Sequence, residues 1–257
     1  MNEASSNQGI KQWEIHFPGG QQARAVCCSA DTPAALLQPL LGIPQPGALL
    51  AIAGGAFQMD EQLYPLVRYL LVEGVVPSIV RANGMIIDGG TFAGVMRLIG
   101  EARAAQPRAF PLLGVSPAGC VAYPEKPSVS KDTELVQLDL NHSHFVLVDT
   151  WKWGGETSTM YNLIQLFSAD CPSVALVING GAIARQEVLY NVRQQRPVIV
   201  IEGSGRAADE IARASREQSP STVDPELAEI ITHDALHLFP LTGSPADLAR
   251  LVQHLLH

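Results

Sequence analysis

The sequence predicts an α/β fold: a Rossmann-like, doubly wound and mostly parallel sheet with a small N-terminal β addition. Short, continuously apolar runs alternate with longer segments of helical periodicity, which is typical of βαβ units with strands buried on both faces. Several of these runs end in glycine, as βα turns do. With 257 residues, of which 47% are hydrophobic, the chain can bury the core of one large domain.

The first half of the chain begins with a predicted hairpin and continues with βα units. Residues 1–47 are expected to form a β extension packed on a main domain of residues 48–257. Pro18-Gly19-Gly20 separates two strand-like runs. The expected strands are 13–17, 23–28, 48–53, 85–87 and 110–115, and the expected helices are 61–76 and 92–105. Residues 117–140, rich in proline, serine and charge, predict a long loop.

The second half repeats the alternation. The expected strands are 144–149, 174–179, 197–202 and 236–240. Helices are expected at 157–167, from the 180–181 turn to about 194, from the 203–205 turn to about 216, at 226–232 and at 245–256. Residues 218–225 read as a linker.

Composition excludes several classes of function. The formal charge of −8 argues against non-specific binding to nucleic acid or anionic membranes, which usually needs a basic patch. No apolar run approaches the length of a membrane span, and the first residues carry no apolar signal core. The four cysteines contain no C-x-x-C pair, which favours free thiols in a reducing compartment. We therefore expect a soluble, cytoplasmic protein that binds neither nucleic acid nor membrane.

A metal site is also weighed and not predicted. His142 and His144 lie at i and i+2 at the mouth of an expected strand, so they would face the same way. No carboxylate or cysteine stands near them at a familiar ligand spacing, and Asp149 lies at the far end of the strand. Hydrogen bonding of His142 to backbone or ligand is favoured over metal binding, with core packing as the other alternative.

Four strand ends carry glycine and indicate a phosphate ligand. They are residues 53–56, 88–91, 179–182 and 202–206. In open α/β sheets, ligands bind beyond the carboxyl ends of the strands, where helix N-termini offer free N–H groups. One glycine turn alone is explained by backbone conformation, but four on equivalent ends favour a nucleotide. Neither G-x-G-x-x-G nor G-x-x-x-x-G-K-[ST] occurs, which argues against a dinucleotide dehydrogenase or a P-loop NTPase.

The turn at residues 202–206 has the most explicit chemistry. Ser204 is a candidate helix cap, and Arg206 in the first helical turn is a candidate phosphate partner. The alternative for Arg206 is a salt bridge to Glu202 or Asp209.

Four segments together resemble a known family. They are residues 54–56, 88–96, 141–149 (NHSHFVLVD) and 200–209 (VIEGSGRAAD). In this order, over roughly residues 48–215, they resemble the cytosolic N-terminal domain of melastatin-type TRP channels, which belongs to the Rossmann-like SLOG superfamily and is also called LSDAT. The chain resembles a free-standing prokaryotic version of that domain.

The resemblance implies a pocket for ADP-ribose or a related NAD-derived nucleotide. It places the Gly-Gly-Ala and Glu-Gly-Ser-Gly-Arg turns on that pocket, with Arg206 on phosphate. Residues 153–169 contain no Lys or Arg, unlike the channel helix that adds an arginine, so Tyr161 is expected to stack on a base instead. The expected ligand residues are Gly54, Gly55, Ala56, Gly89, Gly90, Thr91, Gly94, Asn141, His142, Tyr161, Gly180, Gly181, Glu202, Gly203, Ser204, Gly205 and Arg206.

A second branch of the superfamily, the cytokinin-activating phosphoribohydrolases, offers a catalytic alternative. Its P-G-G-x-G-T-x-x-E motif corresponds to residues 179–187 here, where Glu187 keeps the catalytic glutamate but the proline, third glycine and threonine are missing. Hydrolysis of an N-glycosidic bond needs a carboxylate placed at the ribose. Glu187 is therefore the one candidate catalytic residue, and a solvated or ion-paired role is its alternative.

These observations lead to one expectation and two alternatives. The leading expectation is a cytoplasmic nucleotide sensor without chemistry of its own, requiring no cofactor, binding a small-molecule nucleotide and forming a homo-oligomer. The first alternative is a nucleotide N-glycosidase or phosphoribohydrolase. The second is an assembly module that has lost its ligand, against which the four glycine turns and Arg206 count.

Overall fold

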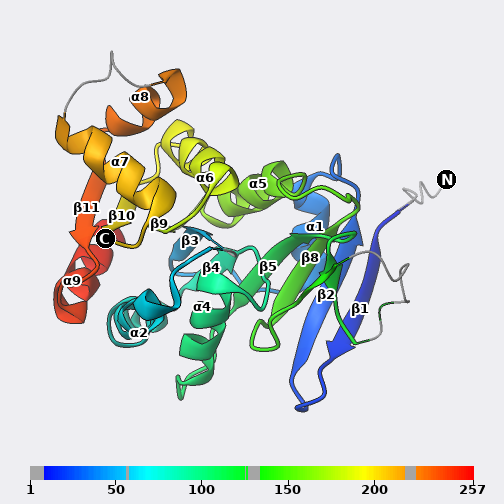
Figure 1. Cartoon of the computed structure of the whole chain (residues 1–257). Helices are drawn as coiled ribbons and strands as arrows, with labels where there is room; N and C mark the ends of the chain where they lie inside the picture. The colour runs from blue at the N-terminus through cyan, green and yellow to red at the C-terminus, as the bar shows by residue number, and fades with distance from the viewer. Residues whose placement is uncertain (1–8, 56–57, 125, 127–133, 218–223) are drawn as a thin grey trace.

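A nine-stranded sheet forms the centre of the molecule (Figure 1). This computed structural model describes residues 9–55, 58–124, 126, 134–217 and 224–257. The strands of the sheet are β1 (Lys11–His16), β2 (Gln22–Cys28), β3 (Leu49–Gly54), β4 (Met85–Asp88), β5 (Leu112–Pro117), β8 (His144–Val148), β9 (Ser173–Ile178), β10 (Val198–Glu202) and β11 (Leu236–Pro240). Their spatial order is β1-β2-β8-β5-β4-β3-β9-β10-β11. Only the β1–β2 hairpin is antiparallel among these pairs.

The order of the strands places a topological switch point between β3 and β9. From β3 the chain adds β4, β5 and β8 outward in one direction, then returns to the other side of β3 with β9 and continues to β10 and β11. The β3–β9 pairing runs in register from Leu49↔Ser173 to Gly54↔Ile178. In open α/β sheets such a point leaves a crevice beyond the carboxyl ends of the two strands.

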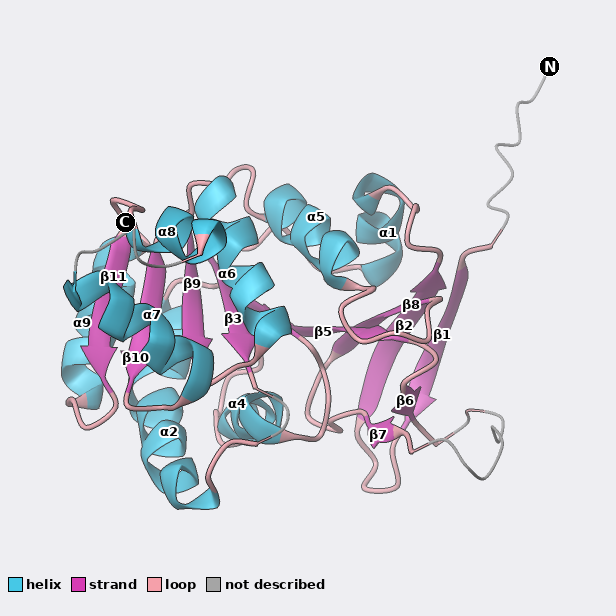
Figure 2. Cartoon of the chain, turned by 45° about the horizontal axis from the view of Figure 1, so that its top comes forward, coloured by secondary structure: helices cyan, strands magenta, loops and turns pink. Residues whose placement is uncertain are grey.

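Helices cover both faces of the sheet, which makes the predicted doubly wound α/β class correct (Figure 2). One face is covered by α1 (Ala34–Leu41), α5 (Thr157–Phe167), α6 (Ala182–Arg193), α7 (Arg206–Glu217) and α8 (Pro225–Ile231). The other is covered by the helical segment Glu61–Arg81, α4 (Gly94–Ala104) and α9 (Pro245–Leu255). The strands β3, β4 and β9 are buried on both faces, as their continuous apolar runs predict.

The segment Glu61–Arg81 is longer than the predicted helix 61–76. It comprises a 3₁₀ turn (Glu61–Leu63), α2 (Tyr64–Leu70), a π turn (Leu71–Val75) and α3 (Val76–Arg81). By length and composition alone it is apolar enough to cross a membrane. In the structure, Val67, Leu71 and Ile79 are buried in the core layer under the sheet, which is the position of a core helix.

The first 47 residues contain β1, β2 and α1, and β2 pairs in parallel with β8 of the main sheet. One region differs from its predicted description. The region 117–140, predicted as a loop, contains β6 (Val121–Ala122) and β7 (Val136–Gln137), which form a small parallel pair. Most of the predicted linker 218–225 lies outside the described residues.

Candidate functional site

A cavity of about 400 Å³ lies at the carboxyl ends of the strands beside the β3–β9 switch point. This volume is within the range of roughly 300–1,000 Å³ usual for small-molecule sites. Its lining is mostly apolar or glycine, with a few polar groups from separate elements. The lining residues are Ile52, Gly54, Gly55, Gln58, Gly89, Thr91, Met96, Trp153, Glu156, Gly181, Ala182, Ile183, Ala184, Glu187 and Arg206.

The N-terminus of α6 and the side chain of Arg206 meet at one wall of this cavity. Gly181, the N-cap residue of α6, provides no side-chain cap, and the first helical turn after it lines the cavity. A Cβ built on Gly181 would lie 2.8 Å from an Nη atom of Arg206, so the glycine lets the guanidinium approach the helix start. Amides at a helix N-terminus beside a guanidinium are a combination that binds phosphate.

The turns after β9 and β10 are cross-linked by two buried side chains. The amide of Asn179 donates to Ser204 Oγ (2.7 Å), and Asn179 Nδ2 donates to the carbonyl of Ser204 (2.8 Å). The Ser204 hydroxyl in turn donates to the carbonyl of Ile201 (2.6 Å). Asn179 and Arg206 both adopt positive φ (56° and 53°), a costly conformation for non-glycine residues that surrounding contacts must maintain. Ser204 is fully buried and positions these turns rather than lining the cavity.

The turn after β4 combines a cavity wall with a close strand contact. Gly89 and Thr91 line the cavity. Gly90 instead has φ of 70°, and its Cβ would lie 2.7 Å from Gly114 Cα on the neighbouring strand. Gly90 is therefore required for backbone conformation and strand packing.

Two carboxyl groups face the cavity from α5 and α6. Glu156 is the N-cap residue of α5 and Glu187 lies in the second turn of α6; their exposed fractions are 7% and 9%. Burial raises the pKa of Glu156 to about 7. Burial, together with the nearby charges of Glu156 and Asp88, raises the pKa of Glu187 well above its ordinary value. In both carboxyl groups, burial therefore favours the protonated form over the ionised one.

His142 lies in a buried network behind the cavity rather than on it. Its Nε2 is 2.8 Å from Asp88 Oδ1 and its Nδ1 is 3.1 Å from Asp139 Oδ1. Each ring nitrogen thus has one carboxylate partner, an arrangement that favours the doubly protonated imidazolium. Burial lowers the pKa of His142, but the two carboxylates outweigh it and raise the pKa to about 9. Asp88 Oδ1 also accepts the Gly90 amide (2.7 Å), so the network supports the β4 turn. Asn141 donates its amide to Asp139 at the amino end of β8 and does not line the cavity.

Tyr161 does not offer its ring to a ligand, which corrects the expectation that it stacks on a base. The side chain is 1% exposed, and its ring stacks on Tyr190 with centroids 5.0 Å apart. Its hydroxyl accepts a hydrogen bond from Asn191 (2.9 Å). The helical phase of α5 turns Tyr161 inward together with Met160 and Ile164.

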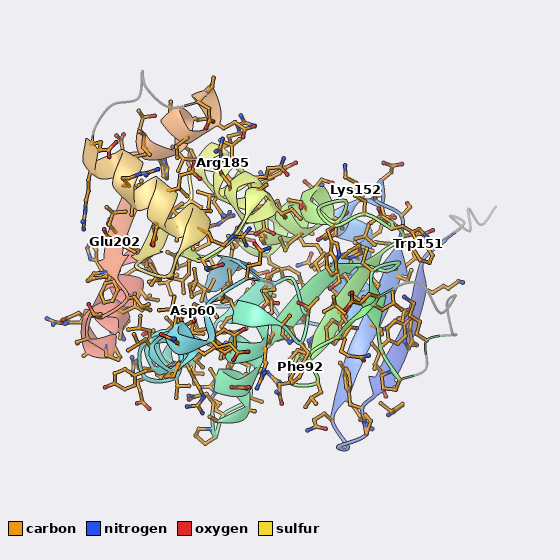
Figure 3. The ribbon with its side chains drawn as sticks, viewed as in Figure 1. Asp60, Phe92, Trp151, Lys152, Arg185 and Glu202 are labelled. Atoms are coloured by element: carbon orange, nitrogen blue, oxygen red, sulfur yellow. The ribbon has the colours of Figure 1, made fainter. Side chains whose placement is uncertain are left out.

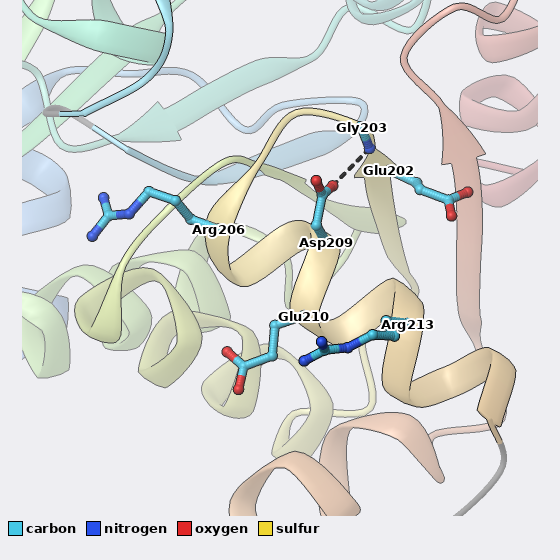
Figure 4. Close-up of a pocket in the computed structure, with 6 residues that line it drawn as sticks. All are labelled: Glu202, Gly203, Arg206, Asp209, Glu210 and Arg213. Carbon is cyan, nitrogen blue, oxygen red and sulfur yellow. Dashed lines mark hydrogen bonds between the residues drawn. The ribbon is translucent and has the colours of Figure 1, made fainter.

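A second, shallower cavity of about 510 Å³ adjoins Arg206 on the outside of α7 (Figure 4). Its other lining residues are Glu202, Gly203, Asp209, Glu210 and Arg213. The two carboxylates offered as alternative partners of Arg206 contact other groups: Asp209 accepts the Gly203 amide (2.6 Å) and Glu202 pairs with Arg216 (2.5 Å). In Figure 4, the guanidinium of Arg206 points away from these carboxylates.

The structure therefore brings together seven of the predicted site residues. Gly54, Gly55, Gly89, Thr91, Gly181, Glu187 and Arg206 line the switch-point cavity. Gly90, Gly94, Asn141, His142, Tyr161, Gly180, Glu202, Gly203, Ser204 and Gly205 are not part of its described lining. Ala56 lies outside the described residues.

Sequence reasoning missed Trp153 and Glu156. Both come from the loop between β8 and α5, in which Trp151 is 64% exposed and Lys152 follows it on the surface (Figure 3). A loop that directly follows a strand lies at the ligand edge of a parallel sheet, so the position of this loop after the strand at 144–149 is the sequence pattern that indicates these two residues. Within the described ranges, no group of three or more His, Cys, Asp or Glu side chains is arranged to hold a metal ion.

Comparison with known proteins identifies relatives of the chain. The family described as "SLOG in TRPM, prokaryote" matches residues 47–250. The human transient receptor potential cation channel subfamily M member 7 is 27% identical, over 91% of this chain and 16% of that protein. A Nematostella vectensis subfamily M member-like 2 protein is 28% identical over 93% of this chain and 20% of its own length. Mouse subfamily M member 2 is 28% identical over 73% and 15%. The chain thus spans a fifth or less of these relatives.

Proposed function

The chain belongs to the prokaryotic family of SLOG domains related to TRPM proteins, and on that basis we propose that it binds a nucleotide in the switch-point cavity. The observation that carries the proposal is the junction of the uncapped α6 N-terminus with Arg206, beside the glycine turns of β3 and β4. Together they offer backbone amides, a positive dipole end and a guanidinium to a phosphate.

ADP-ribose or a related NAD-derived nucleotide is the ligand that we propose for this cavity. Its phosphates would lie at Arg206 and the first turn of α6, and Trp153 supplies an aromatic wall against which a base would pack. The proposed role is that of a sensor in the cytoplasm that assembles as a homo-oligomer. The relatives are named as cation channels, which suggests that ligand occupancy of such a domain is passed on to a partner surface.

The test is calorimetric titration with ADP-ribose, NAD and AMP, comparing wild type with Arg206→Ala. Loss of a charge-assisted contact of about 1.5–3 kcal/mol should weaken binding on the order of tenfold to a hundredfold. Arg213→Ala is the matched control, because Arg213 is exposed on the same helix and does not line the switch-point cavity. Equal affinities in wild type and Arg206→Ala would overturn the phosphate assignment.

A second candidate function, hydrolysis of a nucleotide N-glycosidic bond, is favoured by the two carboxyl groups. Burial raises the pKa of Glu156 to about 7 and that of Glu187 well above its ordinary value, and two such carboxyl groups on one cavity are suited to acid–base chemistry. Release of free adenine or nicotinamide from AMP, ADP-ribose or NAD, followed by chromatography and lost in Glu187→Gln, would establish it. If the nucleotides stay intact after prolonged incubation, the hydrolase function is wrong and binding without hydrolysis remains the proposed function.

A further inference from the structure

The phosphate proposal leaves the carboxyl groups of Glu156 and Glu187 without a ligand partner. They enter the same cavity from different elements, the N-cap of α5 and the second turn of α6. Oε2 of Glu156 is buried and has no hydrogen-bond partner among the described residues. Native structures rarely keep such an atom unpaired, because it has lost its water without gaining a protein partner.

Thr91 adds a second unpaired polar atom from a third element. It lies in the turn after β4, lines the cavity, and is 1% exposed. Its Oγ1 is buried and has no hydrogen-bond partner within the described part of the chain. Two orphaned oxygens that belong to the lining of one cavity indicate a polar group that the ligand itself supplies.

The side chains of Glu156, Glu187 and Thr91 determine which kind of polar group on the ligand would fit here. Two carboxyl groups on one cavity, whose pKa values are raised by burial, present several acceptors and, when protonated, a donor, and a threonine hydroxyl both donates and accepts. An anionic phosphate would be repelled by the ionised carboxylate, and an apolar group would leave every orphan unpaired. A pair of neighbouring hydroxyl groups, each able to donate and accept, satisfies the set.

The position relative to Arg206 matches a sugar phosphate. The guanidinium of Arg206 lies at Gly181, and Glu187 follows on the same helix six residues later, about 9 Å along its axis. This is close to the reach from a 5′-phosphate across a ribose ring. We infer that Glu156, Glu187 and Thr91 form a subsite for the vicinal hydroxyl groups of a ribosyl unit whose phosphate lies at Arg206. The inference rests on the proposed nucleotide site and specifies its ligand as a ribonucleotide.

The experiment compares AMP with 2′-deoxy-AMP and 3′-deoxy-AMP by calorimetry. Wild type should bind AMP at least tenfold more tightly than either deoxy analogue, because a deoxy ligand leaves the buried polar atoms unpaired. Thr91→Val and Glu156→Gln should reduce this preference at least threefold while the phosphate contribution, measured with Arg206→Ala, persists. Glu210→Gln, which lines only the outer cavity, is the matched control and should keep the full preference.

The outcomes separate the two proposals. If wild type binds AMP and the deoxy analogues equally, and Arg206→Ala weakens all three, the nucleotide site stands and the hydroxyl subsite is wrong. If none of the three binds at millimolar concentration and ADP-ribose also fails, both are wrong. If the preference exists but survives both Thr91→Val and Glu156→Gln with folding intact by circular dichroism, the hydroxyls are read elsewhere and the assignment fails.

Discussion

Buried polar side chains differ in their hydrogen bonding between the two edges of the sheet. At the amino edge, Arg196 is 4% exposed and donates to Ser173 Oγ, Asn191 Oδ1 and Gln194 Oε1 over 2.7–3.0 Å. It also lies where α5 and α6 end, and the negative ends of two helix dipoles favour a cation there. At the carboxyl edge, Glu156 and Thr91 are also buried, but each keeps a side-chain oxygen without a hydrogen-bond partner in the described part of the chain.

The difference teaches how to separate a structural charge from a ligand-directed one. Both edges border a cavity of similar volume, about 450 Å³ at Arg196 and about 400 Å³ at the switch point. Volume therefore does not distinguish them. The hydrogen bonding of their buried lining atoms does distinguish them. Glu156 Oε2 and Thr91 Oγ1 at the switch point have no partner among the described residues, whereas the described lining at Arg196 contains no such atom. Asp88, Asp139 and Asn179 also each keep a buried oxygen unpaired within the described part of the chain, so the criterion is used only for atoms that line a cavity.

The largest expected effect is a loss of stability in His142→Ala, which tests whether a buried, fully hydrogen-bonded charge stabilises the fold. Removing the imidazolium in His142→Ala leaves two buried carboxylates, Asp88 and Asp139, without their cation, which should cost about 3–5 kcal/mol of unfolding free energy. In wild type, the folded pKa of about 9 exceeds the ordinary 6.5, so this stabilisation is complete below pH 6.5 and is lost as the pH rises through 9. Urea denaturation across this pH range measures both the loss in His142→Ala and the pH dependence of the wild type. His257→Ala, at an exposed position, is the control. A loss of less than about 1 kcal/mol in His142→Ala would contradict the stabilising role of the network.

Arg196→Leu should produce the next largest loss. Three acceptors lose their donor in a buried region, and we expect a decrease of about 2–4 kcal/mol in unfolding free energy with nucleotide affinity unchanged. Arg193→Leu is the control, since this arginine is 59% exposed in its ion pair with Glu229 and its replacement should change the unfolding free energy little. Denaturant unfolding combined with calorimetry distinguishes the two arginines. A changed nucleotide affinity in Arg196→Leu would contradict the interpretation that this arginine has a structural role only.

Glu156→Gln should act in the opposite direction. The folded pKa of about 7 lies above the ordinary 4.5, so the folded state holds the extra proton and stability falls as the pH rises from 4.5 to 7. Replacing the carboxyl should raise stability at pH 8 by about 1–3 kcal/mol and flatten the profile in this window. The charge of Glu156 acts on Glu187 and Cys120, and Glu187 in turn interacts with Asp88 and Tyr161. A profile that is as steep in Glu156→Gln as in wild type would assign the slope to one of them.

The smallest expected effect concerns Thr91→Val. Its hydroxyl oxygen has no hydrogen-bond partner among the residues that the structure describes. The free energy of unfolding should therefore fall by no more than about 0.5 kcal/mol, or rise slightly, as thermal unfolding would measure. Ser204→Ala is the informative contrast, because that hydroxyl bridges Asn179 and Ile201 and its removal should cost about 1–3 kcal/mol. If Thr91→Val destabilises as strongly as Ser204→Ala, the threonine is structural.

The sequence predicts the strands, their parallel pairing and the glycine turns, because periodicity and turn chemistry are local properties. It also predicts Arg206 and Gly181 at one wall, since residues that follow parallel strands meet at one edge. His142 fails the same test: it precedes β8 and so lies at the amino end of that strand. Tyr161 lies off the cavity because the helical phase of α5 turns it into the core. Helix α1 was missed because it contains Pro39 and lacks a side-chain cap.

Glu156 shows what local patterns do not contain. It is a single carboxylate at a helix start, where acidic residues are common for reasons of helix stability. Its burial depends on α6 and on the loop that carries Trp153, which approach only in the folded chain. No spacing pattern along the sequence therefore predicts the burial of Glu156.

The β3–β9 seam has a consequence for how the molecule assembles. β3 acquires its second neighbour only when Leu49 pairs with Ser173, so until then its apolar edge is open to wrong partners. Contacts so distant along the chain are slow to form because the loop between them must close first. Gly54 and Gly55 lie on one side of that seam, and Gly181 and Glu187 on the other. A small molecule bound across it would hold together two strands that are far apart along the chain, and would act chiefly by slowing their separation.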